Sequence, residues 1–189
     1  MKHLQIHRSP VTAGLSDFRL TGPAIQHQSR RLVDIASIFR DREALDVMDP
    51  ETMVYMVQSW HPVAEGTEGG LFFGTTNIMP GTVGREYFMT KGHFHTKGDR
   101  AEYYWGVTGV GMLILMDRNR STRAEQMFPG SLHYIPGETA HRVANTGNEV
   151  LIFGACWPAD AGHDYEEIAR SGFSARLMDV NGTPGLVPV

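Results

Sequence analysis

The spacing of apolar residues predicts a helix near the start of the chain. Between Arg31 and Leu45 the apolar side chains recur three or four residues apart, which places them on one face of a helix. Those side chains are Leu32, Ile35, Ala36 and Phe39. Ser29 stands just before this segment and is a suitable N-cap. The sequence therefore predicts a helix over 31–45, and a shorter one over Asp164–Arg170.

The pattern changes from Met53 onward to short apolar or alternating runs separated by Gly, Pro, Asn and Asp. The runs are MVYMVQSW, LFFGTTNIM, EYFMT, EYYWGV, GMLILM, LHYI and VLIFGACW. Such runs are typical of β-strands. No segment between them is long enough for a helical crossover, so an antiparallel sandwich or barrel is expected. Met112–Met116 is expected to be a buried strand, and the final VNGTPGLVPV to be irregular.

Length and composition favour one soluble domain. The 189 residues are divided here into an N-terminal extension (1–52), a β-barrel (53–170) and a C-terminal tail (171–189). A net charge of -4 without a concentrated basic patch argues against a nucleic-acid partner. The single cysteine, Cys156, suits a reducing compartment. The start of the chain has no apolar leader, and no run is long enough to span a bilayer, so we expect a cytoplasmic protein without a membrane partner.

The stretch GHFHTKGDRAEYYWG, residues 92–106, contains candidate metal ligands. In a strand, His93 and His95 would point to the same face and Phe94 to the opposite one. Residues 96–100 have turn chemistry, so the chain can reverse and return Glu102 beside the two histidines. Two imidazoles and a carboxylate would then meet at one point.

A third imidazole can come from His133 or His141. We prefer His141, which follows a Gly-Glu turn and precedes Asn145 by four residues. Three neutral imidazoles and one carboxylate suit Fe(II), Mn, Ni or Zn. Five other histidines are expected to be surface or structural residues. They are His3, His7, His27, His61 and His133.

Two groups of residues together resemble the cupin pattern. They are His93, Phe94, His95, Glu102 and Gly109, followed by Gly130, Pro136, His141 and Asn145. Glu138 departs from the pattern, which usually has glycine there. The resemblance implies an all-β cupin jelly-roll barrel, here with an N-terminal helical extension, and a divalent metal ion held by His93, His95, Glu102 and His141.

The flanking stretch TTNIMPGTVGREYFMTKGHFHTKGDRAEYYWG narrows the resemblance. It is similar to the signature of the cupin-type phosphoglucose isomerases, which interconvert glucose 6-phosphate and fructose 6-phosphate in glycolysis and gluconeogenesis. The matching residues are Thr76, Pro80, Gly81, Glu86, Tyr87, Thr90, Gly92, His93, His95, Glu102 and Tyr103. The resemblance covers roughly Met53 to Arg170, and it implies a homodimer with one metal ion per subunit, for which Fe2+ is preferred over Mn2+, Ni2+ and Zn2+.

The same resemblance assigns roles in the site. It places the substrate phosphate at Thr76, Thr90 and Gly92, and it places Tyr104, His163 and Tyr165 against the sugar. Of the catalytic candidates Glu102, His163 and Tyr165, Glu102 would move a proton between C2 and C1, although a hydride shift is the alternative route. His163 and Tyr165 would assist ring opening.

Strand geometry adds two expectations to these roles. Thr90 stands three residues before His93, so a bulge at Lys91–Gly92 is needed to turn both side chains toward one cavity. Tyr104 should face that cavity, and Tyr103 and Trp105 should face the core.

Other activities fit the same ligand set. They are a mannose-6-phosphate isomerase, an Fe(II) dioxygenase and a non-catalytic module that binds a sugar phosphate. Thr-rich residues flanked by Lys91 favour a phosphorylated substrate over an apolar one. Arg85 and Lys97 would add positive charge, or would be solvated surface residues.

Overall fold

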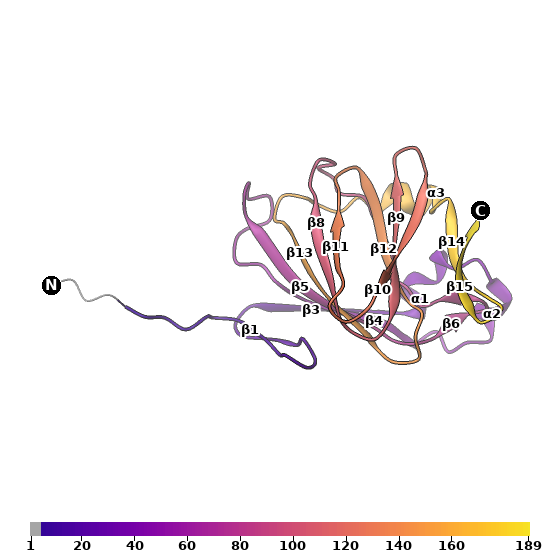
Figure 1. Cartoon of the computed structure of the whole chain (residues 1–189), viewed down its shortest axis with the longest axis horizontal. Helices are drawn as coiled ribbons and strands as arrows, with labels where there is room; N and C mark the ends of the chain where they lie inside the picture. The colour runs from indigo at the N-terminus through magenta and orange to yellow at the C-terminus, as the bar shows by residue number, and fades with distance from the viewer. Residues whose placement is uncertain (1–4) are drawn as a thin grey trace.

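The computed structural model describes residues 5–189, and β-strands make up most of the regular structure (Figure 1). The largest sheet has six strands in the order β11-β8-β13-β5-β4-β3, and all its neighbouring pairs are antiparallel. The strands are β3 (Ile25–Arg31), β4 (Met53–Trp60), β5 (Leu71–Ile78), β8 (Glu102–Thr108), β11 (Leu132–Ile135) and β13 (Leu151–Pro158). The prediction of an antiparallel all-β architecture is confirmed.

Smaller sheets complete the body. In a three-stranded sheet, β9 (Gly111–Asp117) lies between β10 (Thr122–Met127) and β12 (Thr139–Asn145). A four-stranded sheet has the order β15-β14-β7-β6, and β1 pairs with β2. Their strands are β1 (Thr12–Ala13), β2 (Leu20–Thr21), β6 (Thr82–Val83), β7 (Glu86–Tyr87), β14 (Ala175–Val180) and β15 (Thr183–Pro188).

The C-terminal residues form a regular hairpin, so the prediction that VNGTPGLVPV is irregular is wrong. Strands β14 and β15 pair along their length, from Ala175 opposite Pro188 to Val180 opposite Thr183. The turn is Asn181-Gly182, with φ of 56° and 82°. Asn-Gly favours a hairpin turn that needs positive φ at both central residues, and this local signal was present in the sequence.

The predicted helix over 31–45 is broken into three short pieces. These are α1 (Leu32–Ile35), a 3-10 turn η1 (Ala36–Ile38) and α2 (Arg42–Asp46). Ser29 does not cap the helix, because it pairs with Met56 inside β3 and β4. The amide of Arg40, which a continuous helix would bond to the carbonyl of Ala36, donates instead to the Glu86 carboxylate at 2.6 Å. A tertiary hydrogen bond therefore ends the helical segment.

A predicted helix and a predicted buried strand are present, whereas one of the two aromatic side chains of β8 that were expected to face the core does not. The short helix predicted at 164–170 is α3 (Glu166–Ser171), and the buried strand predicted at 112–116 is β9, where Leu113 to Met116 are buried. Trp105 packs against Phe18 and Phe73. The expectation that Tyr103 faces the core is wrong, because its side chain lies on the outer face of β8 and is 48% exposed.

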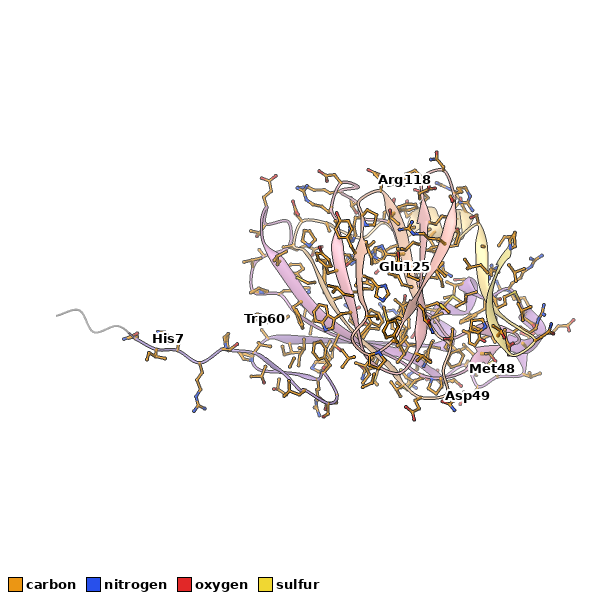
Figure 2. All side chains as sticks on the ribbon, viewed as in Figure 1. His7, Met48, Asp49, Trp60, Arg118 and Glu125 are labelled. Carbon is orange, nitrogen blue, oxygen red and sulfur yellow. The ribbon has the colours of Figure 1, made fainter. Side chains whose placement is uncertain are left out.

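The N-terminal segment projects away from the barrel. Figure 1 shows it extending beyond β1, and Figure 2 places His7 on this projecting part. Ile6 is 99% exposed. His3 lies outside the described residues. Within residues 5–189, no helix has both the length and the apolar character needed to cross a membrane.

Candidate metal centre and substrate cavity

A cavity of about 530 Å³ lies against one face of the six-stranded sheet. Strands β3, β4, β5, β8 and β13 contribute alternate residues to its wall, as in Tyr55, Val57 and Ser59 of β4. This spacing follows from the two-residue period of a strand, which turns every second side chain to the same face. The opposite wall contains His141 of β12 and the segments around residues 90–93 and 162–165.

Four side chains meet at the inner end of this cavity. One donor atom each from His93, His95, Glu102 and His141 lies within 4.8 Å of all the others, and all four donor atoms are buried. Oε1 of Glu102 lies 2.5 Å from Nε2 of His141 and 3.5 Å from Nε2 of His95. None of the four inward atoms makes a hydrogen bond of normal geometry within the described chain. The donors thus converge on one point, as the ligands of a single ion do.

The backbone that positions His93 differs from the expected strand pair. His93 forms an isolated bridge with His141: each amide donates to the other's carbonyl, at 3.3 and 3.1 Å. Phe94 bridges to Asp164. The pairing of residues 93–95 is therefore with β12 and with the segment before α3, not with the strand that begins at Glu102. Glu102 still reaches the histidines because it is the first residue of β8.

Hydrogen bonds on the outer sides of two imidazoles orient their rings. Nδ1 of His95 lies 2.8 Å from the carbonyl oxygen of Arg100, and Nδ1 of His141 lies 3.1 Å from that of Thr139. A carbonyl can only accept, so each Nδ1 must donate, which leaves the Nε2 lone pair free and directed inward. This is the arrangement that metal-bound histidines normally show.

Burial and neighbouring charges adjust the protonation of the cluster. Burial favours the neutral form of Glu102, but the imidazoles of His141 and His95 outweigh it and hold the pKa of this carboxyl below its usual value. Burial, together with His141, lowers the pKa of His93 well below its usual value. Burial and the Glu102 charge raise the pKa of Tyr104. A carboxylate among imidazole nitrogens is a donor set that suits a divalent cation.

His133, the alternative to His141 as the third imidazole, lies outside the metal cluster. His133 is buried, and its two ring nitrogens lie 2.9 Å from Glu125 and 3.0 Å from Ser131. Both of its polar atoms are therefore satisfied within the barrel wall. The structure brings His141, rather than His133, to the other candidate ligands.

The residues expected to hold the phosphate, Thr76, Thr90 and Gly92, all line the cavity and are called the phosphate cradle below. Gly92 has φ of +78°, so the kink that was required between Thr90 and His93 is present. Oγ1 of Thr90 accepts a hydrogen bond from the Val143 amide at 3.1 Å. The hydroxyl proton of Thr90 is therefore available to a ligand oxygen.

Tyr104, His163 and Tyr165 also line the cavity, as expected. The rings of His163 and Tyr165 are nearly parallel, 5.8 Å apart, and the His163 ring lies 4.5 Å from that of His93. Burial lowers the pKa of His163, which keeps it neutral near pH 7. A neutral imidazole with a phenol beside it can both accept and donate a proton.

Two residues that line the cavity were not predicted from the sequence. Arg30 and Tyr55 line the cavity beside the phosphate cradle. Burial raises the pKa of Tyr55 to about 12, so its hydroxyl remains a hydrogen-bond donor at neutral pH. The signal for Arg30 was strand alternation, since Gln26, Gln28 and Arg30 are spaced by two, but β3 was not predicted as a strand. Tyr55 lies on β4, which was predicted as a strand without a role for this side chain. Among the other cations considered, Lys91 lines the cavity and its Nζ lies 4.8 Å from the centre of the Tyr165 ring.

Two of the cations considered for the substrate cavity, Arg85 and Lys97, do not line it. Arg85 lines a second cavity of about 350 Å³, which it shares with Arg40 and Arg176. Lys97 donates to Asp160 at 2.8 Å, and Arg100 donates to the same carboxylate at 2.8 and 3.0 Å. The loop that carries Lys97 is thus fixed to the end of β13 by ion pairs.

Replacing Asp160 with asparagine should make folding less stable in a pH-dependent way. The Arg100 guanidinium and Lys97 hold the pKa of Asp160 below its usual value. The folded state therefore binds fewer protons than the unfolded state, and the stabilisation is present above the unfolded pKa of about 4 and is lost as pH falls further. In urea titrations, the difference in unfolding free energy between wild type and Asp160→Asn should shrink below about pH 4.

Glu68 provides a matched control, because it lies near the same Arg100 guanidinium as Asp160. Glu68 lies 3.9 Å from Arg100 and is 82% exposed, so Glu68→Gln should leave stability unchanged at each pH. A difference between wild type and Asp160→Asn that stayed constant down to pH 3 would contradict the proposed linkage.

Comparisons with known proteins give consistent results. A model of the family described as glucose-6-phosphate isomerase (GPI) matches residues 29–185. The glucose-6-phosphate isomerase of Thermococcus kodakarensis is 44% identical over 161 residues, which cover 85% of this chain and 84% of that protein. The same-named protein of Pyrococcus horikoshii is 46% identical over 81% of each chain. That of Sinorhizobium medicae is 37% identical over 79% of this chain and 71% of its own.

Solved structures that resemble the chain include oxalate decarboxylase from Bacillus subtilis. One such structure, determined at pH 4.6, aligns with a TM-score of 0.46 and 19% identity. The alignment covers 64% of this chain and 29% of that chain.

Proposed function

The chain belongs to the cupin-type glucose-6-phosphate isomerase family, and on that premise we propose that it interconverts glucose 6-phosphate and fructose 6-phosphate with a divalent metal ion. The observation that supports this most directly is the set of four buried donor atoms that lack hydrogen bonds and converge at the inner end of the cavity. The phosphate cradle lines the same cavity. The candidate metal ligands and the residues proposed for the phosphate therefore line one cavity.

His93, His95, Glu102 and His141 would hold the ion. The inward Nε2 atoms and one carboxylate oxygen suit Fe2+ best in our proposal, with Mn2+, Ni2+ and Zn2+ as alternatives for the same donor set. When bound, such an ion polarises a carbonyl oxygen as a Lewis acid.

The phosphate would bind at the cradle in the same cavity. Thr76, Thr90 and the Gly92 amide offer hydrogen-bond donors, and Arg30 and Lys91 supply positive charge at the same part of the cavity. A phosphate monoester is close to a dianion near neutral pH, so these cations favour phosphorylated sugars over free ones. Anchoring the phosphate directs C1 and C2 toward the metal centre and Tyr104.

Proton transfer would use residues already in this space. Glu102 would remove the C2 proton to give an enediol and return it at C1, and the nearby Tyr104 hydroxyl would hydrogen-bond to the reacting oxygens. His163 and Tyr165, stacked side by side, would move the proton that opens the sugar ring. A direct hydride shift is the competing route, and the solvent isotope distinguishes the two.

The test is metal restoration. Protein stripped with EDTA and reloaded separately with Fe2+, Mn2+, Ni2+ or Zn2+ should convert fructose 6-phosphate to glucose 6-phosphate, measured by coupled NADP reduction with glucose-6-phosphate dehydrogenase. Run in deuterated water, the enediol route should place deuterium in the product. No turnover with any metal, in folded and loaded protein, would contradict the proposal; oxygen uptake would then test a dioxygenase, and mannose 6-phosphate another isomerase.

We also infer a cytoplasmic homodimer. Strand β11 ends the six-stranded sheet, and it exposes Leu132 (67%) and Tyr134 (53%) beside Tyr103 (48%). Apolar side chains on an open strand edge favour association with a second copy.

The cytoplasmic location is inferred from the single free cysteine, Cys156, which suits a reducing compartment. The homodimer has its own test. Light scattering after size-exclusion chromatography measures the oligomeric state.

A further inference from the structure

Arg142 lies directly behind the phosphate cradle, on the side away from the cavity. It follows His141 on β12, so strand alternation points its side chain to the opposite face. Its Nη2 donates to the carbonyl oxygen of Lys91 at 2.9 Å, and its Nη1 donates to Sδ of Met89 at 3.1 Å. A Cβ atom placed on Gly92 would lie 2.9 Å from Nε of Arg142. The guanidinium therefore touches the backbone of the cradle.

Among residues 5–189 no carboxylate contacts this guanidinium, while Arg176 and Glu86 act on its charge in opposite directions. Arg142 is buried, and it makes no ion pair with a carboxylate among residues 5–189; its Nε has no hydrogen-bond partner there. Its flat face packs on the Phe173 ring, 4.2 Å from the ring centre. By contrast, Arg176 is paired with Glu86, and Arg100 with Asp160. An unpaired buried cation is costly, so a reason for keeping one here is required.

The hydrogen bond to Lys91 also fixes one peptide unit. The Lys91 carbonyl and the Gly92 amide belong to the same trans peptide, in which C=O and N–H point in opposite directions. Because the carbonyl points at Arg142, the amide points the other way, toward the cavity that Gly92 lines. Within the described chain, the Gly92 amide donates to no protein acceptor. A cation on the carbonyl also polarises the peptide and strengthens its N–H as a donor.

We propose that Arg142 is a positioning residue for the phosphate group: it orients and polarises the Lys91–Gly92 peptide, and its charge is neutralised when a phosphate dianion occupies the cradle. This inference rests on the proposed function, because that function places the phosphate at Thr76, Thr90 and Gly92. Arg142 does not contact the reacting carbons. Its contribution is to affinity for the phosphate, and it should scarcely affect unphosphorylated sugars.

The experiment compares Arg142→Met with wild type in the metal-loaded enzyme. The variant should raise KM for fructose 6-phosphate and the inhibition constant of inorganic phosphate by about tenfold each, with a smaller change in kcat. Its melting temperature without ligand should change little, because removal of the unpaired buried charge offsets loss of the hydrogen bond to Lys91, but the increase that inorganic phosphate produces in wild type should be reduced. A purely structural residue would show the reverse: a lower melting temperature and an unchanged phosphate constant.

Further variants keep the test decisive. Arg142→Lys retains the charge and Arg142→Gln retains a donor, so phosphate affinity should fall in the order wild type, Lys, Gln; equal affinities would overturn the proposal even if Arg142→Met did not fold. Arg118 is the matched control, since its guanidinium also lies over a ring, that of Phe94 at 3.8 Å, but is paired with Glu138 and Glu167. Figure 2 shows Arg118 near the ends of the strands, and it does not line the cavity. Arg118→Met should leave phosphate affinity unchanged.

The readouts separate this inference from the proposed function. If wild type binds inorganic phosphate but does not turn over fructose 6-phosphate with any metal, the isomerase proposal fails and the Arg142 variants still test the cradle. If wild type turns over substrate and Arg142→Met has an unchanged KM and phosphate constant, only the role of Arg142 fails. A wild-type protein that neither binds inorganic phosphate nor turns over fructose 6-phosphate overturns both.

Discussion

Replacing His141 with alanine is expected to reduce isomerase turnover by roughly a thousandfold or more, because polarisation of a carbonyl by a bound ion contributes several kcal/mol and each 1.36 kcal/mol is a factor of ten in rate. His141 contributes the donor atom nearest to Glu102, at 2.5 Å. Its loss leaves three donors and opens a gap at the buried end of the cavity. Metal content after dialysis, by mass spectrometry, should fall below one ion per chain while the circular dichroism spectrum stays that of wild type.

His133 supplies the control for this prediction. It is buried to a similar degree, but its ring is bonded to Glu125 and Ser131. His133→Ala should lower stability while keeping one ion per chain and most of the activity. If His141→Ala retained a full complement of metal and wild-type turnover, or if His133→Ala lost the ion, the assignment of the ligand set would be wrong.

Three of the four candidate metal ligands were predictable because their signals are local, whereas His141 came from the wider resemblance to the cupin pattern. His93 and His95 are two apart, and both the turn that returns Glu102 and the kink at Gly92 lie within ten residues of them. The departure at Glu138 is resolved by the structure: this residue has φ of 56°, the conformation that glycine usually supplies at such a position. Arg118 donates to the Glu138 carboxylate at 2.6 Å and so helps to hold the side chain.

The remaining features depended on contacts that are distant in the sequence. Leu32, Ile35 and Phe39 are all buried, so the apolar spacing was read correctly, yet the helix stops where the Arg40 amide finds Glu86. No window of the sequence around residue 40 contains that partner. Arg30 was missed for a similar reason, because its strand is defined by pairing with β4 across an intervening helical segment. Tertiary hydrogen bonds overrode local propensity in both cases.

Glu86 shows how a motif residue can serve the fold rather than the chemistry. It is part of the stretch that resembles the isomerase signature, but it does not line the metal cavity. Its side chain is 2% exposed and accepts hydrogen bonds from the Arg40 amide and from the Arg176 guanidinium. One carboxylate thus joins three separate parts of the chain: the segment after η1, β7 and β14.

Glu86→Ala should lower the free energy of unfolding by about 3–5 kcal/mol, because it leaves the Arg40 amide and the Arg176 guanidinium without their buried acceptor. Glu86→Gln should cost less, since an amide oxygen can still accept from Arg40. Urea titrations followed by tryptophan fluorescence measure both. Glu51 is the control: it pairs with Arg31 at 2.8 Å, but both side chains are well exposed, so Glu51→Gln should change stability by less than about 1 kcal/mol. Equal small effects at the two glutamates would contradict this prediction. They would show that the buried Glu86 carboxylate contributes no more to the free energy of unfolding than a surface ion pair does.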